Sequence, residues 1–378
     1  MTRQNHIAWI DLLRITACFM VVLAHQCDAF VAQFLDDRVS FLTGVSIGSL
    51  MRASVPLFVM ITAVLLLPLP EKSTVTSFYR RRLWRIAPGL IFWSVALPVL
   101  AWLYFSHAGA STANPTVDFT GYSAGAIWTK IWTFIFNFNF DTTPLWYLYM
   151  LAGLYFIIPV VGSWLRQASE RDVRAVLWVW FISLFVPYVG QIAPLLGYVG
   201  NYGNMGLFGV CDWNPYGTFY YLSGFLGYVI LAYYLKTWPP KWSAAKCAAI
   251  TIPSFVVGYL ITFFGFVEIN NHFTGQYAML EIIWYFCSIN VVLMTVPMFI
   301  WFSRISIAPR PWLSRLASLT FGIYLCHFVF VFVAYDWLAP LGTAYWLRIL
   351  LGAVVTFGLA GALTWILTLT RPTRALVA

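Results

Sequence analysis

Long apolar stretches, separated by short polar segments, dominate the chain. A helix needs about 20 consecutive apolar residues to cross the hydrocarbon core of a bilayer. The strands of a membrane β-barrel would instead alternate between apolar and polar residues over about ten positions, whereas these stretches are continuous. The pattern therefore predicts an all-α integral membrane protein with about ten transmembrane helices, at Ala8–Val31, Val45–Leu69, Pro88–Phe105, Leu145–Leu165, Ala175–Leu195, Tyr216–Leu235, Ala245–Phe266, Ala278–Phe302, Leu316–Trp337 and Tyr345–Thr368.

Composition agrees with a membrane location. Hydrophobic residues make up 61% of the chain, charged residues make up 9%, and the mean hydropathy is +0.79. A soluble domain carries about 25% charged residues, which keep its surface in contact with water. These values exclude a cytosolic enzyme, a secreted disulfide scaffold, a disordered chain and a nucleic-acid binder. We expect a single membrane domain over residues 1–378, with no fused soluble domain.

The basic residues predict the orientation in the membrane. Ten spans place both termini on one side, and cytoplasmic loops carry an excess of Lys and Arg. One set of span ends carries only Arg38, Lys130 and Arg348. The other set carries most of the basic residues: Arg3, Lys72, Arg80, Arg81, Arg82, Arg85, Arg166, Arg171, Arg174, Lys236, Lys241, Lys246, Arg304, Arg310, Arg315, Arg371 and Arg374. Both termini are therefore expected in the cytoplasm, and the net charge of +9 is largely a consequence of topology.

The first predicted span contains three ionisable residues. At about 100° per residue, Asp11, Arg14 and His25 share one stripe of a helix, with His25 about 16 Å beyond Arg14. Asp11 and Arg14 are three residues apart and can pair. Ionisable groups inside spans are costly and are candidates for function. The alternative is a salt bridge that fixes helix packing together with a hydrogen-bonded core histidine, but three aligned polar groups favour function.

A basic cluster precedes the third predicted span. It comprises Arg80, Arg81, Arg82 and Arg85, which is more positive charge than orientation requires. Guanidinium groups bind phosphate oxygens in bidentate fashion, and Arg82 and Arg85 would point the same way in a helix. The cluster indicates either a phosphate site or an anchor on anionic lipid.

The ninth predicted span contains Tyr324 and His327, and His327 lies near its midplane. This second intramembrane imidazole could line the same cavity as His25. No glycine-rich phosphate loop, zinc-ligand spacing or nucleophile elbow is present, so no metal is expected.

These residues together resemble the acyltransferase-3 family, membrane enzymes that O-acylate cell-surface sugars. One family signature is an arginine, ten residues and a histidine, which Arg14 and His25 match. A second is two arginines separated by two residues, just before the third span, which Arg82 and Arg85 match. Further motifs are matched more loosely by Val55–Ala63, Leu145–Leu148 and Gly322–His327, although the first of these ends in Thr62-Ala63 where the family usually has Ser-Gly.

The resemblance implies a substrate class and a location. Trp146–Val160 and Tyr216–Tyr228 are most similar to the O-acetyltransferases of exopolysaccharides, including the enterobacterial common antigen and xanthan types. Such enzymes take an acetyl group from cytoplasmic acetyl-CoA. The implied acceptor is a hydroxyl of a glycan or of a polyprenyl-linked oligosaccharide at the bacterial inner membrane, with the lipid bilayer as surroundings and no nucleic acid as partner.

The resemblance also implies roles for individual residues. His25 would be the general base, because an imidazole titrates near neutral pH. Arg14 would hold the CoA, Asp11 would orient Arg14, and Arg81, Arg82 and Arg85 would bind the CoA phosphates. Either direct transfer or a covalent acyl-histidine remains open.

Three residues are expected to line the cavity around this site: Trp146, Tyr324 and His327. Tyr324 and His327 are candidates for the group that stabilises the oxyanion.

Two other functions compete with acyl transfer. A transporter or flippase for a lipid-linked saccharide would also need many spans and intramembrane charges, but it often shows paired repeats, and no repeats are visible. A membrane sensor or scaffold would use the buried charges for stability alone.

Overall fold

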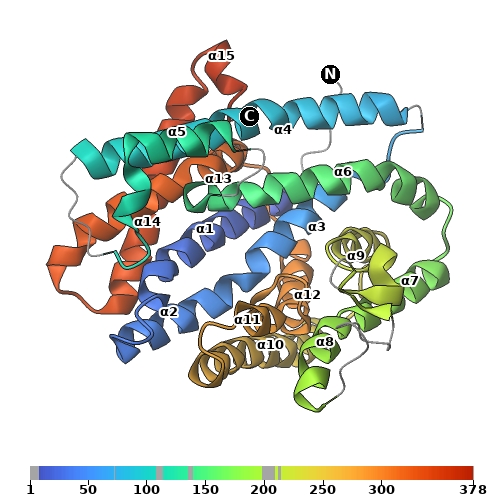
Figure 1. Cartoon of the computed structure of the whole chain (residues 1–378). Coiled ribbons are helices and arrows are strands. Elements are labelled where there is room, and N and C mark those ends of the chain that lie inside the picture. Colours follow the sequence, from blue (N-terminus) through green and yellow to red (C-terminus); the bar gives the residue numbers. More distant parts are fainter. Residues whose placement is uncertain are drawn as a thin grey trace. The chain divides into compact units, whose positions relative to one another are not determined.

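The computed structural model describes residues 8–71, 73–107, 114–134, 139–197, 209–211 and 214–377. Regular structure within these ranges is helical, as predicted (Figure 1). The chain forms two compact units. Unit 1 comprises Met1–Met51, Lys72–Ile157 and Ser306–Ala378, and unit 2 comprises Arg52–Glu71 and Ile158–Ile305.

Unit 1 holds the first helices of the chain and the last. Its elements are α1 (Ala8–Val31), α2 (Arg38–Leu50), α4 (Val75–His107), η2 (Phe119–Tyr122), α5 (Ala124–Trp132), η3 (Phe140–Leu145), most of α6 (Trp146–Leu165), α13 (Pro311–Leu338), η7 (Ala339–Leu341), α14 (Tyr345–Leu367) and α15 (Arg371–Arg374).

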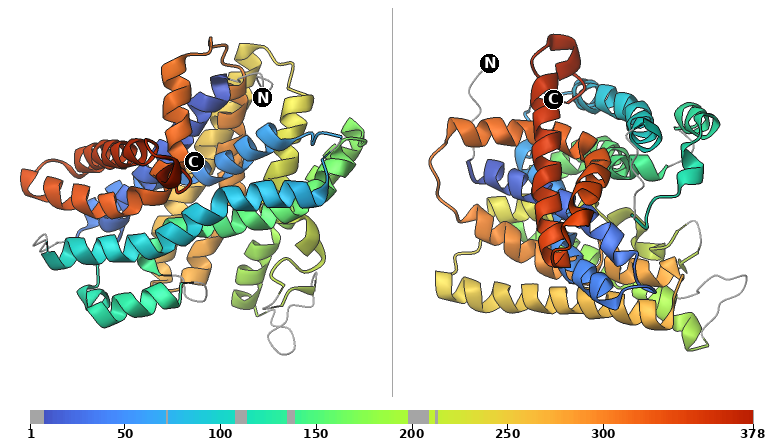
Figure 2. Two further views of the ribbon diagram at one scale, coloured as in Figure 1. Left: turned by 90° about the horizontal axis from the view of Figure 1, so that it is seen from above. Right: turned by 90° about the vertical axis from the view of Figure 1, so that its left-hand side faces the viewer.

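Unit 2 holds the central helices. Its elements are most of η1 (Met51–Ala53), α3 (Ser54–Leu66), the end of α6, α7 (Glu170–Ser183), α8 (Val186–Leu195), η6 (Gly217–Leu222), α9 (Leu226–Thr237), α10 (Ala244–His272), α11 (Tyr277–Trp284) and α12 (Ile289–Ser303). The helix α10 runs its whole length without interruption (Figure 2).

Nine helical stretches in the described ranges are long and apolar enough to cross a membrane. They confirm the prediction of an all-α, multi-pass membrane protein. Each overlaps one predicted span: Ala8–Val31, Arg38–Leu66, Val75–Ser106, Phe140–Leu165, Glu170–Leu195, Ala244–His272, Tyr277–Ser303, Pro311–Leu341 and Tyr345–Leu367.

The sixth predicted span, Tyr216–Leu235, is not a single long helix. A 3-10 turn, η6, is followed by Gly224 with a φ of 66°, a left-handed conformation that favours glycine. Only then does α9 begin, and it has 12 residues. At 1.5 Å per residue α9 is about 18 Å long, shorter than the roughly 30 Å hydrocarbon core. Counting apolar residues did not reveal this break.

In unit 1, α1 is the central helix. It packs against α2, α13 and α14, and α13 in turn contacts α4 and η3. The approach of α14 to α1 depends on Gly352, where an added Cβ would lie 2.5 Å from Nε2 of the buried Gln26. Gln26 also accepts a hydrogen bond from Thr356 of α14. These contacts surround the polar stripe of α1 with protein.

In unit 2, side chains satisfy the backbone where a predicted span is broken. At the break between α11 and α12, three carbonyls accept hydrogen bonds from side chains: those of Ile283 and Trp284, the last residues of α11, and that of Phe286. Asn290 donates to the first, Arg52 to the second and Tyr228 to the third. Non-helical backbone at membrane depth is tolerated only where protein or water satisfies it, so these three side chains stabilise the break.

Asp37 connects the start of α2 to the start of α14. Its carboxylate accepts from the Ser40 N–H at 2.9 Å as the N-cap of α2, and from the hydroxyl of Tyr345. Two hydrogen bonds lower the pKa of Asp37. The larger effect comes from the backbone N–H of Ser40, and the second comes from the side-chain hydroxyl of Tyr345.

We expect Asp37→Ala to lower the melting temperature, because α2 loses its cap and α14 loses its contact with Asp37. A carboxyl whose pKa is lower in the folded state contributes stability above its unfolded pKa, and loses it as the pH falls toward the folded pKa. The contribution of Asp37 is thus complete above about pH 5 and declines below the unfolded pKa of about 3.9.

Differential scanning fluorimetry of the wild type and of Asp37→Asn tests this dependence. Asn caps a helix about as well as Asp but does not ionise. The stability difference between the two proteins should therefore shrink as the pH falls from 5 to 3. A difference that stays constant across this range would contradict the assignment.

Candidate functional site

The polar stripe predicted for the first span lies on one continuous helix. The helix α1 runs without a break from Ala8 to Val31. Arg14 and His25 are therefore separated by about 16 Å along its axis. Asp11 is buried, Arg14 is half-buried, and the side chain of His25 is 20% exposed. All three face the interior of unit 1.

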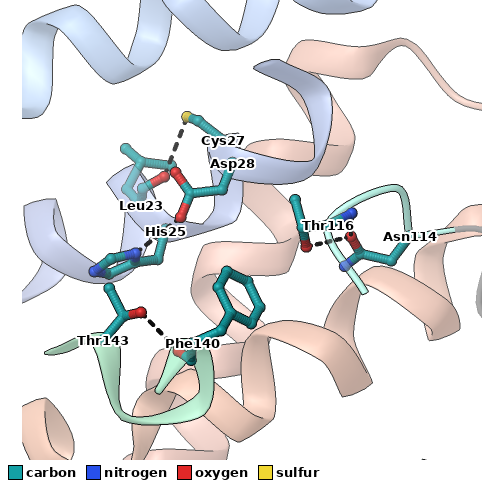
Figure 3. Close-up of polar contacts among 8 residues, drawn as sticks. All are labelled: Leu23, His25, Cys27, Asp28, Asn114, Thr116, Phe140 and Thr143. Atoms are coloured by element: carbon teal, nitrogen blue, oxygen red, sulfur yellow. Dashed lines mark hydrogen bonds and ion pairs between the residues drawn. The ribbon is translucent and has the colours of Figure 1, made fainter. Parts of the chain in front are cut away.

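His25 pairs with an acid that the sequence analysis missed. Its Nδ1 lies 2.9 Å from Oδ2 of Asp28, one turn further along α1 (Figure 3). A carboxylate only accepts, so Nδ1 carries the proton, and Nε2 of the neutral ring has a free lone pair. The i, i+3 spacing of His25 and Asp28 in a predicted helix was a signal that could have identified this pair.

A second imidazole lies beside His25. The ring of His327 on α13 has its centroid 5.4 Å from that of His25, and His327 is fully buried. Its Nδ1 donates to the carbonyl of Tyr324 at 2.7 Å, which makes Nε2 an acceptor. That Nε2 atom is buried and has no hydrogen-bond partner among the described residues. Two imidazole nitrogens with lone pairs therefore lie in the same region.

Apolar rings and a short turn surround the two histidines. The ring of Phe328 meets His25 edge-on at 5.2 Å, and Phe140 of η3 packs on Phe328 at 5.3 Å. The imidazole of His25 points toward η3, where the hydroxyl of Thr143 donates to the Phe140 carbonyl (Figure 3). These groups enclose His327 completely, whereas the His25–Asp28 pair stays partly exposed, with the Asp28 side chain 48% exposed.

A buried ion pair holds η3 in place. Lys130 of α5 lies 2.6 Å from Oδ2 of Asp141, and the hydroxyl of Tyr122 donates to Oδ1. Burial, followed by the charge of Asp141, raises the pKa of Tyr122, so that it remains a neutral donor. Asp141 is two residues from Thr143, so this cluster fixes the turn that faces His25.

Tyrosines continue the site from His327 toward the start of α1. Tyr324 lies 5.9 Å from His327 between ring centroids, and Tyr147 of α6 lies 5.5 Å from Tyr324. The hydroxyl of Tyr324 donates to the Pro144 carbonyl, so its proton is already engaged. Trp146 is half-buried and stands edge-on to Tyr147 at 6.4 Å.

Arg14 lies where these tyrosines meet the basic cluster. Its guanidinium is within electrostatic range of Asp11, of Arg85 on α4 and of Tyr147 on α6. Asp11 and Arg85 are thus the charged residues that act electrostatically on Arg14. Arg14 and Arg85 also repel each other, and an anionic ligand would relieve this repulsion.

The basic cluster belongs to a helix that begins earlier than predicted. The third span was expected to start at Pro88, but α4 begins at Val75 and includes every arginine of the cluster. Arg82 is half-buried over the ring of Phe78 and faces Tyr155 and Arg85. Arg81 is exposed and hydrogen-bonds Ser73 at 3.5 Å. Arg85 is also exposed, but it lies within electrostatic range of Arg14 and Tyr155, and Arg82 lies within electrostatic range of Tyr155.

Side-chain contacts connect Tyr147 through Tyr324 and His327 to His25 and Asp28 inside unit 1. Arg14, Arg82 and Arg85 lie within electrostatic range of the tyrosines at the other end of this series. One end is strongly cationic, and the other carries two basic nitrogens in an apolar environment. Such a series suits a long ligand with phosphates at one end and a reactive group at the other. In the described part of the chain, His, Cys, Asp and Glu form no group of three able to hold a metal ion.

Comparison with protein families gives one match. Residues 7–365 match the acyltransferase domain of the acyltransferase-3 family. Comparisons with curated proteins and with solved structures return no match. Because the match covers nearly the whole chain and includes Arg14, His25, Arg82 and Arg85, the chain belongs to the acyltransferase-3 family of membrane acyltransferases.

Proposed function

We propose that the protein is a sugar O-acetyltransferase of the bacterial inner membrane, with both termini in the cytoplasm. It takes an acetyl group from cytoplasmic acetyl-CoA and transfers it to a hydroxyl of a cell-surface glycan or of its polyprenyl-linked precursor. The observation that carries this proposal is the series of side-chain contacts from Tyr147 to the His25–Asp28 pair, which has Arg14 and the arginines of α4 within electrostatic range of its tyrosine end.

The cationic end fits the donor. CoA carries a pyrophosphate and a 3′-phosphate, and its pantetheine arm separates them from the thioester. Arginine pairs with phosphate through two parallel hydrogen bonds. Arg82, Arg85 and Arg14 would hold the phosphates, with Arg81 at the exposed rim, while the arm extends past Tyr147 and Tyr324. The thioester would then reach His25.

His25 is the base for the transfer. As the acceptor oxygen attacks the thioester carbonyl carbon, the hydroxyl proton moves to Nε2 of His25. The tetrahedral intermediate then collapses, the C–S bond breaks, and the CoA thiolate takes the proton back from Nε2. Asp28 holds the Nδ1–H tautomer and stabilises the imidazolium that forms between these steps.

His327 favours an acceptor with more than one hydroxyl. Its Nε2 accepts but cannot donate while Nδ1 donates to Tyr324, so it does not suit an oxyanion. It suits a second hydroxyl beside the one that His25 deprotonates. Adjacent hydroxyls are characteristic of a sugar, which agrees with a glycan acceptor.

Discontinuous helices, which are common in transporters and flippases, do occur in unit 2. In the break between α11 and α12, however, protein side chains already bind the carbonyls of Ile283, Trp284 and Phe286. Backbone carbonyls that already accept hydrogen bonds from the protein are poor binding groups for a transported ligand. The acyltransferase is therefore the better supported function.

Binding of acetyl-CoA to the purified protein tests the donor site without knowledge of the acceptor. A hydrogen bond to a charged group contributes about 1.5–3 kcal/mol. The double variant Arg82→Ala, Arg85→Ala should therefore weaken binding by roughly 10²–10⁴-fold. Calorimetry measures this affinity. Arg80→Ala is the matched control, since Arg80 is on the same helix but about 200° around its axis from Arg82. An equal loss in the control would show that general positive charge is enough.

Transfer of labelled acetyl groups from acetyl-CoA tests whether His25 acts as the general base. The assay uses membranes of the source cells, which contain the native acceptor, and replaces the endogenous enzyme with each variant. His25→Gln should reduce transfer by about 10²–10⁴-fold, and Asp28→Asn should reduce it by less, with acetyl-CoA affinity unchanged in both. Asp36→Asn removes a nearby carboxylate outside the site and should have no effect. Full transfer by His25→Gln would rule out its role as base.

The His327→Leu variant tests whether His327 binds the acceptor or only stabilises the fold. Loss of the Nδ1 hydrogen bond lowers the free energy of unfolding by about 0.5–1.5 kcal/mol. Removal of a buried unpaired nitrogen raises it by about 1–3 kcal/mol. The melting temperature should thus be unchanged or higher, whereas transfer should fall, mainly through a higher KM for the acceptor. His327→Gln, which keeps an acceptor atom, should recover part of the affinity. A strongly destabilised His327→Leu protein would indicate a structural histidine.

A further inference from the structure

A groove in unit 2 lies apart from the polar contacts described above. Its volume is about 340 Å³, and it is open on one side. Four helices line it: α7, α9, α10 and α12. The lining residues are Arg174, Leu177, Trp178, Trp180, Phe181, Leu231, Tyr234, Ser254, Val292, Leu293 and Val296.

The groove is apolar except at one end. Among its polar side chains, Ser254 donates to the Leu293 carbonyl, Trp180 to the Gly224 carbonyl and Tyr234 to Glu170. These groups are therefore engaged within the protein. The exposed guanidinium of Arg174, near the start of α7, is the cation among the lining residues. An occupant would need a long apolar part and an anionic end.

The groove is long enough for part of an acyl chain. It extends along α7 from Arg174 to Phe181, which is seven residues or about 10 Å. An acyl chain that lies along this length would place its apolar surface on the lining side chains and its charged end at Arg174.

The groove also lies between two pairs of packed helices. Within unit 2, α7 packs against α9, and α10 packs against α12. Lining residues come from both pairs. An apolar chain in the groove would remove apolar surface of both pairs from contact with mobile lipid and would connect them by dispersion contacts.

We propose that this groove binds one acyl chain of an anionic phospholipid, with the lipid phosphate on Arg174. In the orientation expected from the basic residues, Arg174 lies at the cytoplasmic leaflet, where anionic lipids are found. The bound lipid completes the packing between the α7–α9 and α10–α12 pairs. This site does not depend on the proposed transferase activity.

Native mass spectrometry of the full-length protein in detergent tests the proposal, with phosphatidylglycerol and phosphatidylcholine as probes. One arginine near a membrane surface contributes about 1 kcal/mol toward anionic lipid, or roughly a five-fold preference. We expect the wild type to prefer phosphatidylglycerol by about this factor, and Arg174→Gln to lose the preference. Arg171→Gln changes an exposed arginine on the same helix that does not line the groove, and should keep it.

Photo-crosslinking locates the bound chain. Phosphatidylglycerol with a diazirine in its acyl chain should label the groove around Leu293 and Val296, and Arg174→Gln should reduce this labelling. A smaller hollow of about 220 Å³ between α10 and α12 is an internal control, because its lining carries no charged residue. Its labelling, around Met298 and Phe302, should not depend on the head group or on Arg174.

Three outcomes would overturn the proposal. The first is equal binding of the two phospholipids by the wild type. The second is the same effect from Arg171→Gln as from Arg174→Gln. The third is displacement of phosphatidylglycerol by a lower concentration of undecaprenyl phosphate, which would assign the groove to a polyprenyl lipid. The Arg174→Gln variant changes an exposed side chain, so its folding is not at risk.

Discussion

Hydrocarbon offers no hydrogen bonds, so every polar group that α1 carries into the membrane must find its partner inside unit 1. Asp11 and Arg14 are close to each other and to Arg85, and Gln26 receives a hydrogen bond from Thr356 of α14. His25 pairs with Asp28. The packing of α2, α13 and α14 around α1 follows from this requirement as much as from apolar burial. The Nε2 atom of His327 is buried without a described partner, and this makes it the clearest mark of a ligand site.

The pattern of apolar residues was sufficient to predict the helical membrane fold, because length and continuity of apolar runs are local properties. It could not predict where spans break. The break between α11 and α12 is stabilised by Arg52 and Tyr228, which are distant in the sequence, and the short α9 depends on the backbone conformation of Gly224. Such features arise from tertiary contacts that no local window contains.

The candidate site could be predicted from the sequence to a similar degree. The stripe of Asp11, Arg14 and His25 follows from helix geometry alone, and α1 is continuous as assumed. The proximity of His327 to His25 could only be guessed, because the two residues belong to the first and the penultimate spans. Asp28 was overlooked although its spacing from His25 made a pair foreseeable. The engagement of Tyr324 with the Pro144 carbonyl required the fold itself.

The ion pair between Lys130 and Asp141 has a consequence for access to the imidazoles. Asp141 is almost fully buried, and Lys130 comes from α5, a nine-residue helix whose Trp128 and Trp132 are exposed. If α5 moved away, it would leave an uncompensated carboxylate in an apolar interior, at a cost of about 3–5 kcal/mol. The turn η3 and α5 are thus obliged to move as one body. An opening in which η3 moves away from His25 would therefore carry this surface helix with it, so the properties of the surrounding lipid would influence how often η3 moves.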